Sequence, residues 1–494
     1  MPHRRSQTES REFRKELGLL SSTMIVIGSL VGSGIFIVSA DVARTVGSPG
    51  LLLVTWIVTG VFTMIAALSY GELAGMMPQA GGQYVYLREA WNPLVGFLFG
   101  WTLFLVIQSG SIAAIAVAFA KFTAVFFPAL GENNILSSVF GRDITAAQLV
   151  AVASVLLLTA INIRGVREGK IVQDIFTFVK IAALLLLIVL GVSVGYNAEV
   201  AAANFGRMWD SAWTHMADGS IASVESLSGF MIPAAVGVAM VGTIFSLDAW
   251  NNITFTAGEV IHPRRTIPRS LAVGTVIVAL LYVAVNVAYL LVLPIGGSPE
   301  AADAVGRGMQ FATADRVSTA MMSAMFGAPG ELLMAGMIMI STFGCNNGMI
   351  LAGARVYYAM ARDGLFFANA GTLNTNGVPA WALIMQAAWS VVLCLSGSYG
   401  ELLDYVVSAV LIFYVLSIAG IFRLRAKRPD EERPSRAFGY PVLPALYIVT
   451  AVAIMALLLF HKPEFTWPGM VIVLLGVPVY YAWRKWGHGA SINR

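Results

Sequence analysis

Long apolar runs recur along the whole of this 494-residue chain. Each run holds about 20 residues, which is enough for a helix to cross the hydrocarbon core of a bilayer. Only 12% of the residues are charged, which is about half the share of an ordinary soluble protein. The sequence therefore predicts an all-α integral membrane protein with short loops.

About twelve such runs fix the expected organisation, in which residues 1–494 form a single membrane domain. The run at 92–127 is longer than one crossing needs, so we expect a tilted helix there. The expected helices lie near 17–39, 50–76, 92–127, 144–163, 170–195, 229–256, 270–293, 330–361, 378–396, 401–425, 440–460 and 467–486.

Basic residues are unevenly divided between the two sides of these helices. Of the 31 Lys and Arg residues, 23 fall on the side of the N-terminus and 6 on the other, while Lys121 and Lys180 lie within spans. Cytoplasmic loops are enriched in Lys and Arg. We therefore expect an even number of spans, both termini in the cytoplasm, and a place in the cell (inner) membrane.

Several classes of protein are disfavoured by what the sequence lacks. The five histidines lie at termini or in expected loops, while Cys345 and Cys394 lie in apolar segments. Neither a metal site nor a disulfide framework is therefore expected. The sequence has no P-loop GxxxxGK[ST], no GxSxG and no HExxH, so we expect no ATP-driven pump, no enzyme and no cofactor. Nothing in it points to nucleic acid.

The first apolar run is interrupted by three glycines in the stretch GSLVGSG at 28–34. Each costs roughly 1 kcal/mol in a helix interior relative to Ala. At the depth of a bilayer, non-helical backbone is tolerated only where protein buries it or where it lines a cavity. A broken helix offers N–H donors at one end and C=O acceptors at the other. The run therefore predicts a site for a small ligand with both a carboxylate and an ammonium.

A second interruption is indicated at 245–252, FSLDAWNN, where Asp248, Asn251 and Asn252 stand in an apolar segment. Interrupted segments at corresponding positions of two halves point to the binding site of a transporter. A mid-membrane acid costs roughly 3 kcal/mol on the insertion scale, so Asp248 should face a cavity or a partner. It could bind protons, favour a cationic substrate, or reach water or an unwound backbone N–H.

Motifs in a fixed order along the chain carry a resemblance. They are GSGIF at 32–36, PQAGGQYVY at 78–86, VQD at 172–174 followed by Lys180, WN at 250–251, GEV at 258–260 with Pro263, FG at 343–344, NG at 347–348, AR at 354–355, RP at 433–434 and YPV at 440–442. In this order the chain resembles the L-type amino acid transporters of the amino acid–polyamine–organocation superfamily.

The resemblance implies a fold and an activity. The fold is the LeuT type with twelve transmembrane helices, in which the repeats 17–195 and 229–425 are inverted relative to each other and two peripheral helices occupy 438–486. The activity is sodium-independent transport of neutral amino acids, often by obligatory exchange. Proton-coupled symport or uniport stays open as an alternative, and a non-transport membrane sensor is a remote one.

The resemblance also bears on partners. Animal members join a heavy subunit through a cysteine in the loop after the third helix, but the corresponding loop here, about 128–143, has no Cys. We therefore expect no disulfide-linked heavy subunit, and the chain resembles the stand-alone bacterial members. The expected partners are amino acid substrates and the lipid bilayer.

Residue roles follow from the same resemblance. Backbone N–H groups of Ser33 and Gly34 would hold the substrate carboxylate, and carbonyls of Leu30, Phe245 and Asp248 would hold its ammonium. Phe245 would also close over the substrate as a gate. The alternative is that the glycines only allow tight helix packing. The expected substrate-binding residues are Leu30, Gly32, Ser33, Gly34, Ile35, Phe245, Ser246, Asp248 and Trp250.

Lys180 is the only basic residue deep inside an apolar span. In the family that this chain resembles, a lysine here acts as a fixed replacement for sodium and bridges three helices. Gly32, Ser341 and Cys345 are its expected partners, because the last two lie one helical turn apart. The alternative is a lysine that snorkels to the interface, but about ten residues separate it from the start of its helix.

The two longest loops on the outer side, about 196–228 and 295–329, contain short amphipathic pieces. They would form either surface helices at the membrane interface or a lid over the outer entrance.

Overall fold

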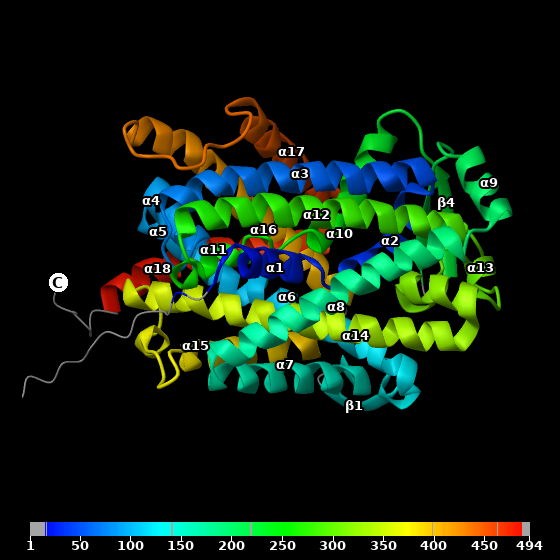
Figure 1. Ribbon diagram of the computed structural model, residues 1–494, viewed down its shortest axis with the longest axis horizontal. Helices are drawn as coiled ribbons and strands as arrows, with labels where there is room; N and C mark the ends of the chain where they lie inside the picture. The colour runs from blue at the N-terminus through cyan, green and yellow to red at the C-terminus, as the bar shows by residue number, and fades with distance from the viewer. Residues whose placement is uncertain are drawn as a thin grey trace, which may run out of the picture.

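The computed structural model describes residues 15, 17–139, 142–217, 220–397, 399–461 and 463–486. Long helices run side by side along the longest axis of the molecule (Figure 1). The segments 1–14 and 487–494, whose cytoplasmic location the charge distribution predicts, lie outside the described residues.

The first half of the chain contains nine α-helices. A π-helical turn, Leu103–Ile107, joins two of them, so that Pro93–Phe126 forms one apolar span of 34 residues. This agrees with the long helix predicted at 92–127. The helices are α1 (Leu19–Leu30), α2 (Gly34–Val46), α3 (Pro49–Met76), α4 (Gln83–Ala90), α5 (Pro93–Thr102), α6 (Gln108–Phe126), α7 (Ala146–Arg164), α8 (Val166–Ser193) and α9 (Ala198–Gly206).

The second half contributes the remaining helices. These are α10 (Met231–Ser246), α11 (Asn252–Phe255), α12 (Pro263–Val292), α13 (Ala304–Arg307), α14 (Val317–Arg362), α15 (Ala380–Ser396), α16 (Tyr399–Lys427), α17 (Val442–His461) and α18 (Pro463–Trp486). α14 begins well before the predicted 330–361, because a further helical piece precedes Gly327, where the backbone turns to φ 62°.

Two antiparallel hairpins were not anticipated from the sequence. One pairs β1 (Ile135–Val139) with β2 (Arg142–Thr145), and the other pairs β3 (Ala212–Ala217) with β4 (Ser220–Ser226). Both lie in segments expected to be loops. The all-α expectation therefore holds for the apolar helices and fails in these two connections, where short strands pair locally.

The helices have the length and composition of membrane spans. In the described part of the chain, nine helices are long and apolar enough to cross a membrane, or ten if the bent pair α1 and α2 counts as one span. α10 and α15 are shorter apolar helices. The chain is thus built as a multi-pass membrane protein.

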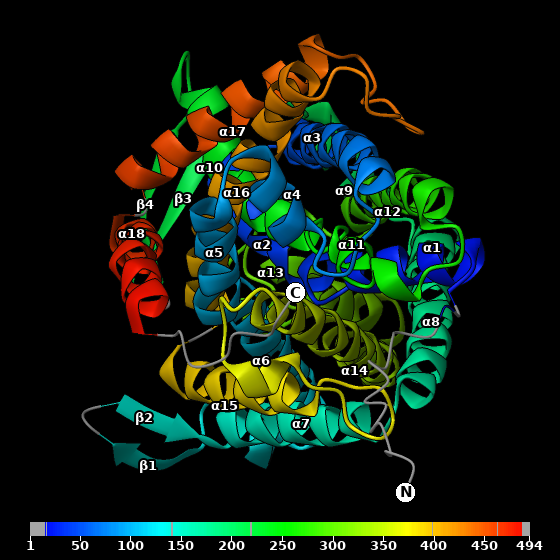
Figure 2. The ribbon, with the colours of Figure 1, turned by 90° about the vertical axis from the view of Figure 1, so that its left-hand side faces the viewer.

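The break between α1 and α2 is buried in the bundle. α1 packs against α12, α8 and α14, and α2 packs against α10; α1 begins at the rim of the bundle in Figure 2, but residues 26–40 around the break are all buried. α17 and α18 lie at the periphery, as the end-on view of Figure 2 shows. Backbone that has left the helical ladder is therefore surrounded by protein rather than by lipid, as it must be at this depth.

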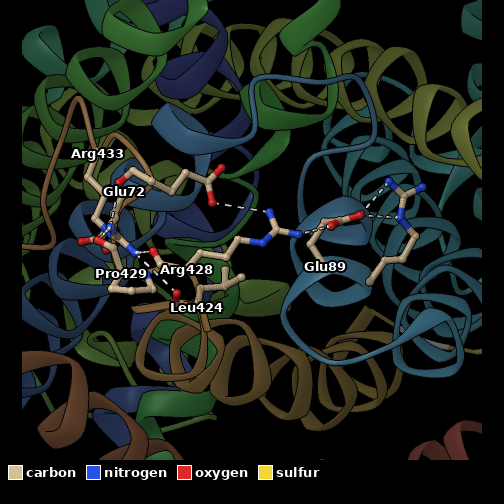
Figure 3. Close-up of polar contacts among 8 residues, drawn as sticks. Glu72, Glu89, Leu424, Arg428, Pro429 and Arg433 are labelled. Carbon is tan, nitrogen blue, oxygen red and sulfur yellow. Dashed lines mark hydrogen bonds and ion pairs between the residues drawn. The ribbon is translucent and has the colours of Figure 1, made fainter. Parts of the chain in front are cut away.

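Ion pairs tie together the helix ends at one face of the bundle (Figure 3). The Glu72 carboxylate of α3 accepts hydrogen bonds from Arg425 of α16, at 2.9 and 2.7 Å, and lies 3.4 Å from Arg433. Glu89 of α4 accepts from Arg428 at 2.6 Å. Burial of Glu89 opposes its ionisation, but the hydrogen bonds and charges of Arg428 and Arg88 together outweigh this effect and lower the pKa of the Glu89 carboxyl.

Candidate functional site

The first helix breaks within the predicted glycine-rich stretch. α1 ends at Leu30 and α2 begins at Gly34, and the two are bent by 40°. Val31 leaves the helix with ψ 86°, and the Gly32 N–H turns back to the Leu30 carbonyl at 2.9 Å. The break therefore removes ordinary i to i+4 hydrogen bonds from the last turn of α1.

Lys180 supplies one of the missing donors. Its side chain is fully buried, and its Nζ donates to the Gly28 carbonyl at 2.7 Å. The expected partner was Gly32, four residues further on. In an unbroken helix the Gly32 N–H would bond the Gly28 carbonyl, but here it bonds Leu30 instead. The ammonium of Lys180 thus donates to the Gly28 carbonyl, which has lost its helical N–H donor at the break.

α14 supplies further donors to the same turn. The Cys345 thiol donates to the Ser29 carbonyl at 3.2 Å, and the Ser341 hydroxyl lies 3.4 Å from the Gly32 carbonyl. A Cβ at Gly32 would stand 3.2 Å from Cys345 Sγ, so α14 packs closely on the break. Lys180, Ser341 and Cys345 are therefore gathered around one helix end, as their expected grouping required.

The second break separates α10 from α11. α10 ends at Ser246, and Ala249 has φ 65°, a left-handed conformation that is uncommon for a residue other than glycine. Asp248 is 8% exposed, and the Tyr414 hydroxyl of α16 donates to its Oδ1. A side-chain partner from α16 was not among the roles considered for Asp248 from the sequence.

The two breaks line a small cavity. Seven of the nine expected substrate-binding residues line it, and they come from both broken helices. The remaining wall comes from α6 and α14. The lining residues are Ser29, Leu30, Gly32, Ser33, Gly34, Ser111, Ile115, Phe245, Ser246, Asp248, Ala249, Cys345 and Met349.

Ile35 and Trp250 do not line this cavity. The Ile35 side chain is buried, and its carbonyl accepts a hydrogen bond from the Tyr289 hydroxyl at 3.2 Å. Trp250 packs edge-on against Tyr70, with ring centroids 4.8 Å apart, and lies 5.4 Å from the Tyr414 ring. Both residues therefore support the wall from behind instead of facing its interior.

Five of the lining residues were not predicted from the sequence to belong to the site. They are Ser29, Ser111, Ile115, Ala249 and Met349. Ser111 and Ile115 are four residues apart on α6, so they share a face, but the sequence does not say which face of a uniformly apolar helix turns inward. Ser29 and Ala249 lie inside the two interrupted stretches, and this position is the sequence signal that could have assigned them to the site.

The helix ends at the cavity carry partial charges of both signs, as a ligand with a carboxylate and an ammonium requires. The N-terminus of α2 carries the positive end of the helix dipole, and Ser33 there makes no side-chain cap. A Cβ on Gly34 would meet Ser246 Oγ at 2.1 Å, so only glycine lets the start of α2 approach α10 this closely. The Leu30 carbonyl accepts from the Tyr282 hydroxyl at 3.0 Å, so a ligand ammonium would share that oxygen.

A second cavity adjoins the first and shares Ser111, Asp248, Ala249 and Met349 with it. Within the described ranges, no group of three or more His, Cys, Asp or Glu side chains could hold a metal ion. The chemistry of the site is therefore that of backbone dipoles, hydroxyls and one carboxylate, which suits binding of a small zwitterion.

Comparison with known proteins identifies the family of the chain. The family model "Amino acid permease" matches residues 17–480. Among the relatives, "Large neutral amino acids transporter small subunit 2" of Rattus norvegicus is 29% identical, over 96% of this chain and 82% of that protein. "Serine/threonine exchanger SteT" of Bacillus subtilis is 27% identical, over 97% and 99%. "Asc-type amino acid transporter 1" of Mus musculus is 28% identical, over 97% and 83%. The chain belongs to the amino acid permease family.

Proposed function

We propose that this protein is a sodium-independent exchanger of neutral amino acids that works by alternating access. The observation that carries the proposal is the Lys180 ammonium, buried and 2.7 Å from the Gly28 carbonyl at the break of the first helix. A fixed cation there gives the broken helix end the positive charge that a bound ion would otherwise supply. Transport then has no requirement for sodium at this position.

The substrate's two charged groups find opposite partners in the cavity. Its carboxylate binds the N–H groups at the start of α2, at Ser33 and Gly34, where the helix dipole is positive. Its ammonium lies toward the carbonyls that end α1 and α10, including those of Leu30 and Phe245. Phe245 lines the same cavity, and we assign it the gate that closes over the bound amino acid.

The names of the relatives support exchange and neutral substrates. One is called a serine/threonine exchanger and another a transporter of large neutral amino acids. The second name also describes a small subunit, but the loop around 128–143 of this chain has no Cys. We therefore propose a stand-alone transporter without a disulfide-linked heavy subunit.

The arrangement of breaks supports a LeuT-type fold. With α1–α2 and α10–α11 each counted as one crossing, and α15 included, the apolar helices make twelve spans. The broken segments open the proposed repeats 17–195 and 229–425, and α17 and α18 form the peripheral pair within 438–486. We place the protein in the cell membrane with both termini in the cytoplasm, because the Lys and Arg residues are concentrated on that side.

Proton-coupled transport is the second candidate, since Asp248 lines the cavity and carries a titratable carboxyl. Its bond from Tyr414 gives Asp248 a structural partner as well. A proton-coupled carrier would move substrate into vesicles that contain none, whereas an obligatory exchanger would not.

The test is uptake of radiolabelled alanine into sodium-free proteoliposomes, with and without unlabelled alanine trapped inside. An exchanger takes up label only when substrate is trapped. Uptake into empty vesicles that grows with an inward proton gradient would replace this proposal with proton coupling. If folded protein took up no label into either kind of vesicle, the proposal that it transports amino acids would be contradicted.

A further inference from the structure

One buried hydroxyl in the cavity wall has no hydrogen-bond partner. Ser29 is 3% exposed, and its Oγ makes no hydrogen bond. Other buried polar atoms in the described part of the chain share this condition, but Ser29 is the only one of these residues that lines a cavity described above. A buried polar atom without a partner is costly and calls for an explanation.

Ser29 lies in the wall of the cavity. The residue lies on the last turn of α1, and its backbone carbonyl is taken by the Cys345 thiol at 3.2 Å. Ser111 of α6 lines the same cavity and is 3% exposed. A serine hydroxyl both donates and accepts hydrogen bonds. Ser29 and Ser111 are therefore suited to a ligand group that also does both, such as a hydroxyl.

We propose that the Ser29 hydroxyl binds a hydroxyl group on the substrate side chain. The inference rests on the proposed function, in which an amino acid occupies this cavity. The carboxylate and ammonium of that amino acid already have partners at the helix ends. The side chain is therefore the group left to meet Ser29.

The size of the cavity narrows the substrate class. Ile115, Phe245 and Met349 are bulky side chains in its lining, and they restrict the substrate to one with a small side chain. Ser29 is therefore a specificity-determining residue for amino acids with small hydroxylated side chains. Serine and threonine are preferred over alanine and valine, which match them in size but lack the hydroxyl.

The test compares these matched pairs in Ser29→Ala protein reconstituted in proteoliposomes. We expect the ratio of threonine to valine exchange, and of serine to alanine exchange, to exceed one in the unaltered protein. Both ratios should fall about three- to tenfold in Ser29→Ala, the range for loss of one hydrogen bond. A ratio measured in the same vesicles does not depend on the amount of folded protein.

Ser22→Ala is the matched control. Ser22 lies on the same helix, is fully buried, also has a hydroxyl without a partner, and lines neither cavity at the breaks. Its substitution should leave both ratios unchanged.

Two results would overturn the inference. Equal exchange of threonine and valine by the unaltered protein would do so even if Ser29→Ala did not fold. Unchanged ratios in Ser29→Ala are the second; if exchange of both substrates fell equally, the hydroxyl would act on the substrate backbone instead. Failure of the unaltered protein to exchange any of the four amino acids would instead overturn the proposed function.

Discussion

Replacement of Gly34 by Ala should disrupt transport through the contact between α2 and α10. A Cβ at this position would lie 2.1 Å from Ser246 Oγ, 2.6 Å from Ser246 Cβ and 2.8 Å from Ser246 Cα. The hydroxyl could rotate away, but the Cα belongs to the backbone. An ordinary contact needs at least 3.4 Å, so the two segments must separate by several tenths of an ångström.

Overpacking of this kind costs about 1–3 kcal/mol. We expect the upper half of that range, because backbone is involved on both sides of the contact. If the strain falls on the substrate-binding arrangement, 2–3 kcal/mol lowers exchange roughly 30- to 150-fold. Gly32→Ala meets only the end of a flexible side chain, Cys345 Sγ at 3.2 Å, so its loss should stay below about fivefold.

The assay is alanine exchange in proteoliposomes, with the melting temperature of each variant in detergent as a check on folding. Gly206→Ala is the control, since a Cβ there would meet nothing within 4 Å. Exchange by Gly34→Ala at the rate of the unaltered protein would refute the argument from packing. So would a larger loss in Gly32→Ala than in Gly34→Ala.

Two further predictions concern buried and exposed charges. Lys180→Met should lower alanine exchange at least tenfold, because the Gly28 carbonyl loses a charged donor. Lys121→Met, which loses a 3.7 Å ion pair with an exposed glutamate, should exchange normally. Equal losses in both variants would contradict the role assigned to Lys180. Glu89→Gln should lower the free energy of unfolding at pH 7 by about 1 kcal/mol or less. Because the folded-state pKa of Glu89 is lowered, its contribution exists above the unfolded pKa of about 4.3 and is lost as the pH falls further. Thermal melts should therefore converge at acidic pH, and a difference that grew there would be contrary to expectation.

The sequence located the breaks because their signals are local. Three glycines within 28–34 disfavour an uninterrupted helix, and an acid at Asp248 disfavours a segment that faces lipid. The burial of Lys180 was predictable for the same reason, since its distance from the helix start left no route to water. These features depend on the chain itself and on the depth of the membrane.

The details of the site depend on helix rotation and on partners far away in the chain. Tyr414 reaches Asp248 across 166 positions of sequence, and no local pattern announces that bond. Ser111 lies on a mostly apolar helix without a marked polar face, so the side that turns inward was not apparent. Trp250 stood in a recognisable motif, but its ring packs behind the cavity wall, because the turn after α10 directs it toward Tyr70.

The central claim is that the two broken helices hold the carboxylate and the ammonium of one amino acid. Binding of radiolabelled alanine to the purified protein, competed by analogues that each lack one charge, tests this most directly. We predict that unlabelled alanine competes, whereas alaninamide, without the carboxylate, and propionate, without the ammonium, do not. Competition by either analogue at the concentration that suffices for alanine would contradict the account.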